Sequence, residues 1–220
     1  MISLLRHHFS EIFHHTEKYR KKYSTRFKPY LTFTKATISN PRAVGAACPS
    51  SPFLARAMSE QIDINSDGYV IELGGGTGMI TQALLAHGVA PDKLITVEFS
   101  CELAQHLREK FPNIHVLEGD AGKLDKLLEE HIGEVRNIHA IVSGLPLRSL
   151  PKPNVKAIKK QIHNLIGEEG LFIQFTYDLR LSSSQKKKFQ LRKTRIVWRN
   201  IPPARVNTYI SAYPRKLSEN

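Results

Sequence analysis

The run Val70-Ile71-Glu72-Leu73-Gly74-Gly75-Gly76-Thr77-Gly78 places four glycines between an apolar stretch and an amphipathic one. An apolar run that ends in glycines and continues with helical spacing predicts a strand, a tight turn and a helix. Gly74, Gly76 and Gly78 let the backbone bend sharply and approach a bound molecule without interference from Cβ atoms, and the amides at the start of the helix face that molecule. The sequence therefore predicts a cofactor loop at this turn.

Strand and helix patterns alternate along the chain after this loop. The expected strands cover 69–73, 94–98, 114–118, 140–143 and 171–177, and the expected helices cover 78–87, 101–111, 123–130 and 155–166. Such alternation is typical of a parallel sheet with right-handed crossovers and helices on both faces. Two runs rich in β-branched and aromatic residues, 189–198 and 205–212, predict two closing strands. We therefore expect an α/β, Rossmann-like sheet of seven mostly parallel strands.

Length and composition favour one globular domain. The chain has 220 residues, of which 41% are hydrophobic and 24% charged. No run approaches the roughly 18 apolar residues of a spanning helix, and the first residues lack the apolar core of a secretory signal. Cys48 and Cys101 stand alone, without the spacing of a zinc ribbon or a disulfide scaffold, which fits a reducing cytosol.

The positive charge is concentrated at the two ends of the chain. Residues 1–30 hold seven basic and two acidic residues, and residues 179–220 hold eleven basic and one acidic, within a formal net charge of +12. Residues 31–178 hold fourteen basic and seventeen acidic residues. This split predicts that the ends meet phosphate, either on nucleic acid or on anionic lipid, or that they form a solvated basic face.

The N-terminus has the pattern of an amphipathic helix. One apolar stripe recurs at helical spacing and comprises Ile2, Leu5, Phe9, Ile12 and Phe13. Such a helix lies flat in a layer of lipid headgroups or packs on its own domain, and both readings stay open. The cluster Lys186-Lys187-Lys188 is a second candidate anchor for lipid phosphate. We expect an attachment and collar region at 1–52 and a catalytic domain at 53–220.

Two cofactor classes use a loop of this kind. A nicotinamide-type G-x-G-x-x-G loop needs glycine or alanine at position 79, where Met79 stands. The spacing Glu72-x-Gly74-x-Gly76-x-Gly78 instead resembles the first motif of class I S-adenosylmethionine (SAM) methyltransferases. Three elements after the next strands also resemble that family: Glu98, Gly119-Asp120-Ala121 and Ser143-Gly144-Leu145-Pro146-Leu147.

The resemblance implies SAM as the cofactor. It implies that Glu98 holds the ribose hydroxyls, that Asp120 lies beside the adenine amine, and that Ser143 lies over the sulfonium and its methyl group. The cofactor-binding set implied in this way is Glu72, Gly74, Gly76, Gly78, Glu98, Asp120, Ala121 and Ser143.

The cofactor motifs do not identify the acceptor, because adenine-dimethylating enzymes resemble this chain in the cofactor half. Those enzymes carry Asn-Leu-Pro-Tyr or a similar run after the fourth strand to hold a flipped base, whereas this chain has Ser143 and Leu147 at the two ends of that run. Residues 40–210 resemble the small bacterial phospholipid N-methyltransferases, in stretches that include Asn40–Ala46 and Asn200–Val206. That resemblance implies phosphatidylethanolamine as substrate, methylated stepwise toward phosphatidylcholine at the cytoplasmic face of the inner membrane. A nucleic-acid adenine methyltransferase and a non-catalytic binding module remain the alternatives.

Phosphatidylethanolamine is protonated near neutral pH and must lose a proton before it attacks a methyl group. Tyr177, at the end of the fifth strand, is the candidate to hold the headgroup or relay its proton, and Ser143 is the second candidate catalytic residue. Leu145 and Pro146 are expected to contact the substrate, and Arg205 to hold lipid phosphate. The histidine pairs near the N-terminus are expected at an interface, with no metal site.

Overall fold

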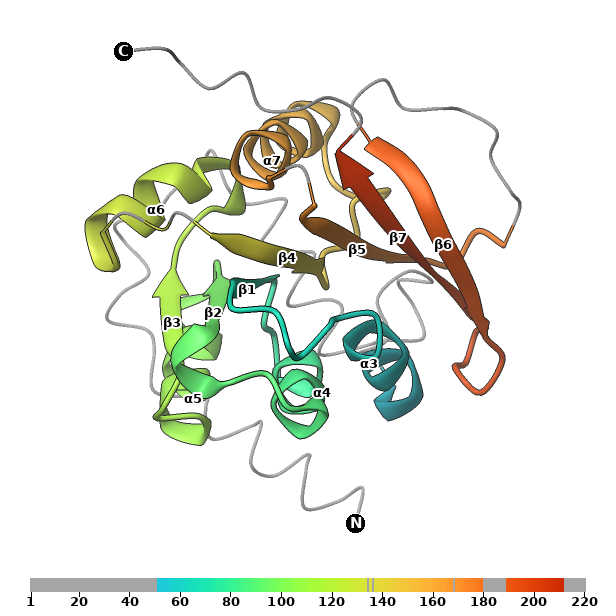
Figure 1. Cartoon of the computed structure of the whole chain (residues 1–220), viewed down its shortest axis with the longest axis horizontal. Coiled ribbons are helices and arrows are strands. Elements are labelled where there is room, and N and C mark those ends of the chain that lie inside the picture. Colours follow the sequence, from blue (N-terminus) through green and yellow to red (C-terminus); the bar gives the residue numbers. More distant parts are fainter. Residues whose placement is uncertain (1–50, 134, 136, 168, 180–188, 212–220) are drawn as a thin grey trace.

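The computed structural model describes residues 51–133, 135, 137–167, 169–179 and 189–211. The strands are β1 (Tyr69–Leu73), β2 (Leu94–Glu98), β3 (His115–Glu118), β4 (Ile138–Ser143), β5 (Leu171–Thr176), β6 (Phe189–Val197) and β7 (Ala204–Ser211). The helices are α3 (Pro52–Ser59), α4 (Met79–His87), α5 (Cys101–Lys110), α6 (Leu124–His131) and α7 (Lys152–Leu165). Figure 1 shows their arrangement. The expected strands and helices are present, with small differences at their ends.

All seven strands form one sheet in the order β3-β2-β1-β4-β5-β7-β6. The strands β1 to β5 are parallel to one another, and β7 is antiparallel to both β5 and β6. The predicted Rossmann-like sheet of mostly parallel strands is therefore confirmed. The carboxyl ends of β1 to β5 meet at one edge of the sheet, which we call the carboxyl edge.

Helices cover both faces of the sheet, with α6 and α7 on one side and α3, α4 and α5 on the other (Figure 1). Successive residues of a strand point to opposite faces. Ile71 of β1 packs in the core beneath α6 and α7. Its neighbour Val70 packs in the core beneath α3 and α4. The strands are buried on both faces, which explains why they read as continuous apolar runs rather than as an alternation.

Local sequence signals set the helix ends. The Oγ atoms of Ser51 and Ser100 accept hydrogen bonds from the backbone N–H groups of Leu54 and Leu103, so both serines cap the helices that follow them. α7 begins at Lys152, earlier than the expected Val155, with a proline in its first turn. Proline fits there because its missing N–H would have had no partner within the helix.

Most of the predicted attachment region lies outside the described residues, which begin at Ser51, and so does the lysine cluster at 186–188. The expected domain boundary at 52/53 falls at the first residue of α3, a helix that packs into the core beneath β1 and β4. Within the described ranges, no helix combines the length and the apolar character needed to cross a bilayer. The N-terminal amphipathic helix stays a prediction.

Candidate functional site

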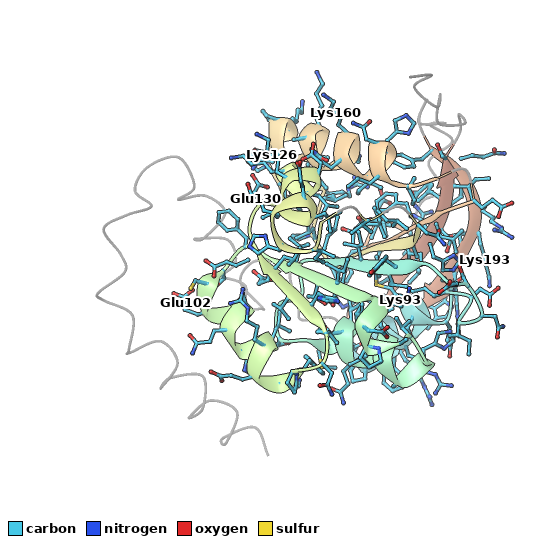
Figure 2. All side chains as sticks on the ribbon, turned by 60° about the vertical axis from the view of Figure 1, so that its left-hand side comes forward. Lys93, Glu102, Lys126, Glu130, Lys160 and Lys193 are labelled. Carbon is cyan, nitrogen blue, oxygen red and sulfur yellow. The ribbon has the colours of Figure 1, made fainter. Side chains whose placement is uncertain are left out.

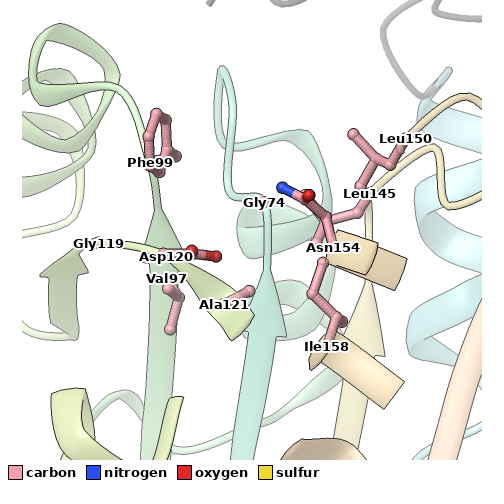
Figure 3. Close-up of a pocket in the computed structure, with 10 residues that line it drawn as sticks. All are labelled: Gly74, Val97, Phe99, Gly119, Asp120, Ala121, Leu145, Leu150, Asn154 and Ile158. Atoms are coloured by element: carbon pink, nitrogen blue, oxygen red, sulfur yellow. The ribbon is translucent and has the colours of Figure 1, made fainter. Parts of the chain in front are cut away.

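The loops after β1, β2, β3 and β4 surround one hollow at the carboxyl edge (Figure 3). The space within it measures about 400 Å³, a figure that includes open solvent. Its lining residues are Gly74, Val97, Phe99, Gly119, Asp120, Ala121, Leu145, Leu150, Asn154 and Ile158. The structure thus brings Gly74, Asp120, Ala121 and Leu145, which the sequence singled out, to one place.

The glycine loop has three residues in the left-handed region of backbone space, Gly74 (φ 81°), Gly76 (φ 54°) and Gly78 (φ 81°). A Cβ at Gly74 would lie 2.5 Å from Leu145, and one at Gly78 would lie 2.5 Å from Phe111. Both glycines are therefore required by packing as well as by φ. Gly76 differs, because a Cβ there would meet no heavy atom within 4 Å. The loop therefore exposes its backbone at Gly76 to open space.

Glu98, the last residue of β2, holds the glycine loop from the neighbouring strand. One carboxylate oxygen accepts a hydrogen bond from the N–H of Gly76 (2.9 Å), and the other accepts one from the N–H of Ser100 (2.9 Å). The side chain is buried, and this burial raises the pKa of the Glu98 carboxyl. Each carboxylate oxygen has a further lone pair with which it can accept from a hydroxyl.

Glu72 lies inside the sheet under the glycine loop. Its Oε2 accepts hydrogen bonds from the hydroxyls of Thr81 (2.5 Å) and Thr96 (3.0 Å). Burial raises the pKa of Glu72 to about 8, and Oε1 is buried without a hydrogen-bond partner among the described residues. Protonation of the carboxyl removes the cost of a buried charge, and a donor group of a ligand would give Oε1 its missing partner.

Asp120 and Ala121 form the wall of the hollow after β3. Oδ1 of Asp120 accepts a hydrogen bond from the N–H of Gly122 (2.8 Å) and caps a short 3-10 turn at Ala121–Lys123. The Asp120 carboxylate and the Asn154 amide extend toward the hollow from opposite sides (Figure 3). An acceptor and a donor–acceptor group that face each other across an apolar cleft suit a flat heterocycle with an exocyclic amine.

The Ser143–Leu147 run closes the hollow beside β1. Ser143 is fully buried, and its Oγ accepts a hydrogen bond from the N–H of Leu145 (3.3 Å). A Cβ at Gly144 would lie 2.9 Å from the carbonyl oxygen of Gly74, so the two loops touch backbone to backbone. Leu145 faces the hollow, whereas Pro146 is half-buried outside the hollow's lining and Leu147 packs in the core. The structure thus gives Ser143 a role in shaping the turn, and its catalytic role stays a prediction.

Tyr177 and Arg205 lie at the carboxyl edge but toward opposite faces of the sheet. The Tyr177 ring is half-buried against the Phe175 ring (5.5 Å between centroids) in the core beneath α3 and α4. Arg205 pairs across strands with Thr176, so it points to the α7 face, opposite to its buried neighbours Ala204 and Val206. The structure does not bring these two predicted substrate residues together on one face.

Sequence reasoning missed Phe99 and Asn154, both of which line the hollow. Phe99 directly follows Glu98, and Asn154 lies in the first turn of α7. A usable signal was present, because a helix that follows a parallel strand begins near the carboxyl edge and its first turn is close to any ligand there. Pro151 and Pro153 lie just before Asn154 and are typical of a turn, so the sequence predicted a helix only from Val155.

These residues fit SAM. The open position at Gly76 admits a ligand against the backbone, the buried carboxylate of Glu98 has lone pairs for hydroxyl groups, and Asp120 can accept from an exocyclic amine. Phe99, Leu145 and Ile158 supply apolar walls for the adenine and the carbon chain. We therefore assign Gly76, Glu98 and Asp120 as the residues that would hold SAM.

Comparison with characterised proteins agrees with this geometry. The chain is 32% identical to the ornithine lipid N-methyltransferase of Singulisphaera acidiphila over 153 residues, which cover 68% of this chain and 78% of that protein. It is 28% identical to the ribosomal RNA small subunit methyltransferase A of Thermotoga neapolitana over 159 residues, 71% of this chain and 55% of that protein. The chain spans about half the length of the ribosomal RNA methyltransferases that it matches.

Solved structures share the fold. A TehB-like SAM-dependent methyltransferase from Corynebacterium glutamicum superposes with a TM-score of 0.57 at 15% identity, over 82% of this chain and 99% of that chain. The 1,6-didemethyltoxoflavin-N1-methyltransferase of Burkholderia thailandensis, with S-adenosylhomocysteine bound, superposes with a TM-score of 0.60 at 14% identity, over 86% of this chain and 92% of that chain. No protein-family model matches the sequence. The sheet order, the glycine loop and the lipid-methyltransferase relative together show that the chain belongs to the class I SAM-dependent methyltransferases.

Proposed function

We propose that the protein transfers methyl groups from SAM to the amine nitrogen of phosphatidylethanolamine, stepwise toward phosphatidylcholine, at the cytoplasmic face of the inner membrane. The observation that carries this proposal is the environment of Arg205, a guanidinium that is 7% exposed at the carboxyl edge. Its Nε is buried without a partner, and among the described residues no carboxylate pairs with it. A buried cation with an open donor favours an anionic group on the acceptor.

Arg205 lies on the same side of the sheet as the wall of the SAM hollow. Thr176 and Gln174 of β5 share the α7 face with Arg205, and the Gln174 amide donates to the carbonyl oxygen of Leu145 (3.1 Å). Leu145 lines the hollow. Two strands, β4 and β5, therefore separate Arg205 on β7 from β1, and β5 contacts the loop that closes the hollow. In this proposal Arg205 holds the phosphate beside that loop, and the amine, two carbons away, faces the hollow.

The amine must lose a proton before its lone pair attacks. Tyr177 is the proposed headgroup contact or proton relay, and the neighbouring Asp178 carboxylate is held by an ion pair with Arg148. The ammonium proton leaves to water, either directly or through the Tyr177 hydroxyl, which accepts it and releases its own proton to water. SAM, when bound, supplies a methyl group activated by a sulfonium. The new nitrogen–carbon bond forms as the sulfur–carbon bond breaks, so the chain's task is to align the amine and exclude water.

The relative from Singulisphaera acidiphila supports a lipid acceptor, because its name specifies N-methylation of a lipid. Its acceptor, ornithine lipid, also has an amine, so the two lipids must be compared directly. The ribosomal RNA methyltransferase relatives support adenine as a second candidate acceptor. Against adenine stands the run after β4, where Ser143 and Leu147 are both buried and no aromatic side chain is available to stack on a flipped base.

The test is transfer of labelled methyl from SAM to four acceptors assayed in parallel. These are vesicles that contain phosphatidylethanolamine, vesicles that contain ornithine lipid, vesicles of phosphatidylglycerol alone, and ribosomal RNA. We expect label in phosphatidylethanolamine and its methylated products, and none with Asp120→Ala, which lacks the proposed adenine contact. Label only in ornithine lipid would keep the lipid class and overturn the headgroup, and label only in RNA would overturn the proposal.

A further inference from the structure

The turn between β6 and β7 carries apolar side chains that point into solvent. Trp198 is 69% exposed and Ile201 is 83% exposed, and Phe53, in the first turn of α3, is 47% exposed. We call these three residues the apolar tip. Isolated exposed apolar residues are ordinary, but two on one short turn, with a third on the helix that the turn contacts, mark a candidate interaction site.

Polar groups of the turn are satisfied internally, which turns the apolar side chains outward. Asn200 is buried and donates from its amide to the carbonyl oxygen of Pro202 (2.6 Å), and Ser51 donates to the amide oxygen of Asn200 (2.6 Å). The Arg199 guanidinium lies 5.2 Å from the centre of the Phe53 ring. These contacts hold the turn against the start of α3, so the fold itself positions the apolar tip.

The apolar tip is located at the carboxyl edge. Arg205 pairs with Thr176 on one side and with Ile196 on the other, so the ends of β5 and β6 lie in one row with the start of β7. The turn between β6 and β7 projects beyond that row, and Figure 1 shows it beside α3. Whatever the tip contacts is therefore brought to the edge where Arg205 and the SAM hollow lie.

The charge around the tip favours an anionic surface. Residues 189–203 contain four basic residues and no acidic residue; Arg195 is paired with Glu60, and the other three are Arg192, Lys193 and Arg199. One of the four, Lys193, extends outward from β6 at the side of the molecule (Figure 2). Tryptophan and arginine are the side chains suited to the headgroup layer, and an aliphatic side chain on the same turn gains by entering the acyl region.

We propose that the apolar tip inserts into an anionic lipid surface and so presents the carboxyl edge to the membrane. This inference rests on the proposed lipid acceptor and adds a docking surface distinct from the N-terminal region and the lysine cluster. A lipid partner is favoured over RNA because Ile201, the most exposed side chain of the tip, offers neither a stacking face nor a side-chain hydrogen bond, whereas single-stranded RNA is held by stacking and phosphate contacts.

Trp198 is the single tryptophan of the chain, so its fluorescence reports on the tip in the full-length protein. We expect a blue shift with phosphatidylglycerol vesicles and quenching by lipids brominated at a shallow acyl position. Binding to vesicles without any change in emission would overturn the proposal, as would a blue emission before lipid is added, which would mean that another part of the chain covers the tip. A shift with RNA and none with vesicles would overturn it in favour of nucleic acid.

Variants of the apolar tip test whether it binds vesicles. Trp198→Ser and Ile201→Ser should each lower vesicle binding several-fold while SAM affinity and melting temperature stay unchanged. The matched control is Ile64→Ser, because Ile64 is 52% exposed beside Gly88, at the opposite edge of the sheet. A control that loses as much vesicle binding as the tip variants would overturn the proposal.

The methylation readout separates docking from acceptor choice. Tip variants should lose rate on phosphatidylethanolamine in vesicles and keep it on a dissolved short-chain form of the same lipid. Equal loss on both forms would mean that the tip supports the fold of the site and does not dock. If the wild-type protein inserts Trp198 but methylates neither form, docking stands and the proposed acceptor fails.

Discussion

The Glu98 carboxylate accepts a hydrogen bond from the backbone N–H of Gly76 at 2.9 Å, joining the end of β2 to the glycine loop after β1. Its second oxygen accepts from the N–H of Ser100 at 2.9 Å, so the residue also fixes the start of α5. One buried side chain therefore shapes two walls of the SAM site before any cofactor binds. This arrangement is preorganised, since the loop does not have to be ordered by the ligand.

Glu98→Gln should weaken SAM binding by about tenfold or more, because hydrogen bonds to a charged group contribute about 1.5–3 kcal/mol and the amide nitrogen cannot accept an N–H. Isothermal titration with SAM and S-adenosylhomocysteine measures the change, and a melting curve establishes that the variant folds. Glu130→Gln, at an exposed position of α6, is the control for loss of one carboxylate. Unchanged affinity in a folded Glu98→Gln protein would contradict the assigned role.

Gly76→Ala should remove SAM binding at a small cost in stability. The new methyl group would enter open space in front of the loop, at a φ of 54° that costs on the order of 1 kcal/mol for alanine. Gly133→Ala is matched to it, with a φ of 89° and open space around the Cβ, but it lies after α6, away from the hollow. We expect the two variants to have equal melting temperatures and only Gly76→Ala to lose SAM affinity. Loss of affinity in both would mean that strain, and not occupancy of the site, is responsible.

Asp120 has two separable roles. Oδ1 caps the 3-10 turn through the N–H of Gly122, and asparagine can keep that bond with its own oxygen. Asp120→Asn should then fold normally and bind SAM several-fold more weakly, because its remaining polar group is a donor that faces the adenine amine. Asp120→Ala should lose the cap as well, with a lower melting temperature by the equivalent of about 1 kcal/mol. Equal SAM affinity in wild type and Asp120→Asn would show that Asp120 only shapes the turn.

The sheet was predictable because parallel strands buried on both faces give strong local patterns. The segments around Ile71 and Ile141 are continuous apolar runs followed by turn residues, and each is a strand of the structure. The glycine loop was predictable for a related reason, since left-handed backbone and close contacts leave few alternatives to glycine at Gly74 and Gly78. Short-range sequence patterns were therefore enough to predict both the sheet and the cofactor loop.

The substrate side was less predictable because it depends on which face a side chain reaches. Tyr177 and Arg205 both stand at strand ends, yet the alternation of β5 and β7 directs them to opposite faces. The apolar tip was not predictable, because the turn that carries Trp198 and Ile201 is held by the Ser51–Asn200 contact across 149 positions of sequence. Such long-range contacts leave no periodic signal in a single sequence.

Glu72 predicts a pH dependence of stability. Its pKa is about 8 in the folded protein against an ordinary value of 4.5, so between these two values the folded state holds a proton that the unfolded state has released. Stability should therefore be greatest near or below pH 4.5 as far as this group is concerned, and should fall as pH rises toward 8.

Glu72→Gln keeps an acceptor for Thr81 and Thr96 and removes the titration. Chemical unfolding from pH 5 to 8 should show a flatter profile for the variant, by more than about 1 kcal/mol across the range. Parallel profiles would contradict the raised pKa.

Replacing Arg205 should impair turnover without lowering the stability of the fold. Arg205 is 7% exposed, and among the described residues its Nη1 donates to the carbonyl oxygen of Leu179 at 3.5 Å, so its guanidinium is costly to bury in the absence of an anion. Arg205→Met should therefore keep or raise the melting temperature, while the KM for phosphatidylethanolamine rises about tenfold or more and SAM affinity is unchanged. Arg205→Lys should recover part of the activity, since an ammonium keeps the charge but not the planar donor geometry. Arg195→Lys, on the exposed side of β6 in an ion pair with Glu60, is the control and should leave KM unchanged. A lower melting temperature with an unchanged KM in Arg205→Met would show that the guanidinium supports the sheet instead of holding the acceptor's anionic group.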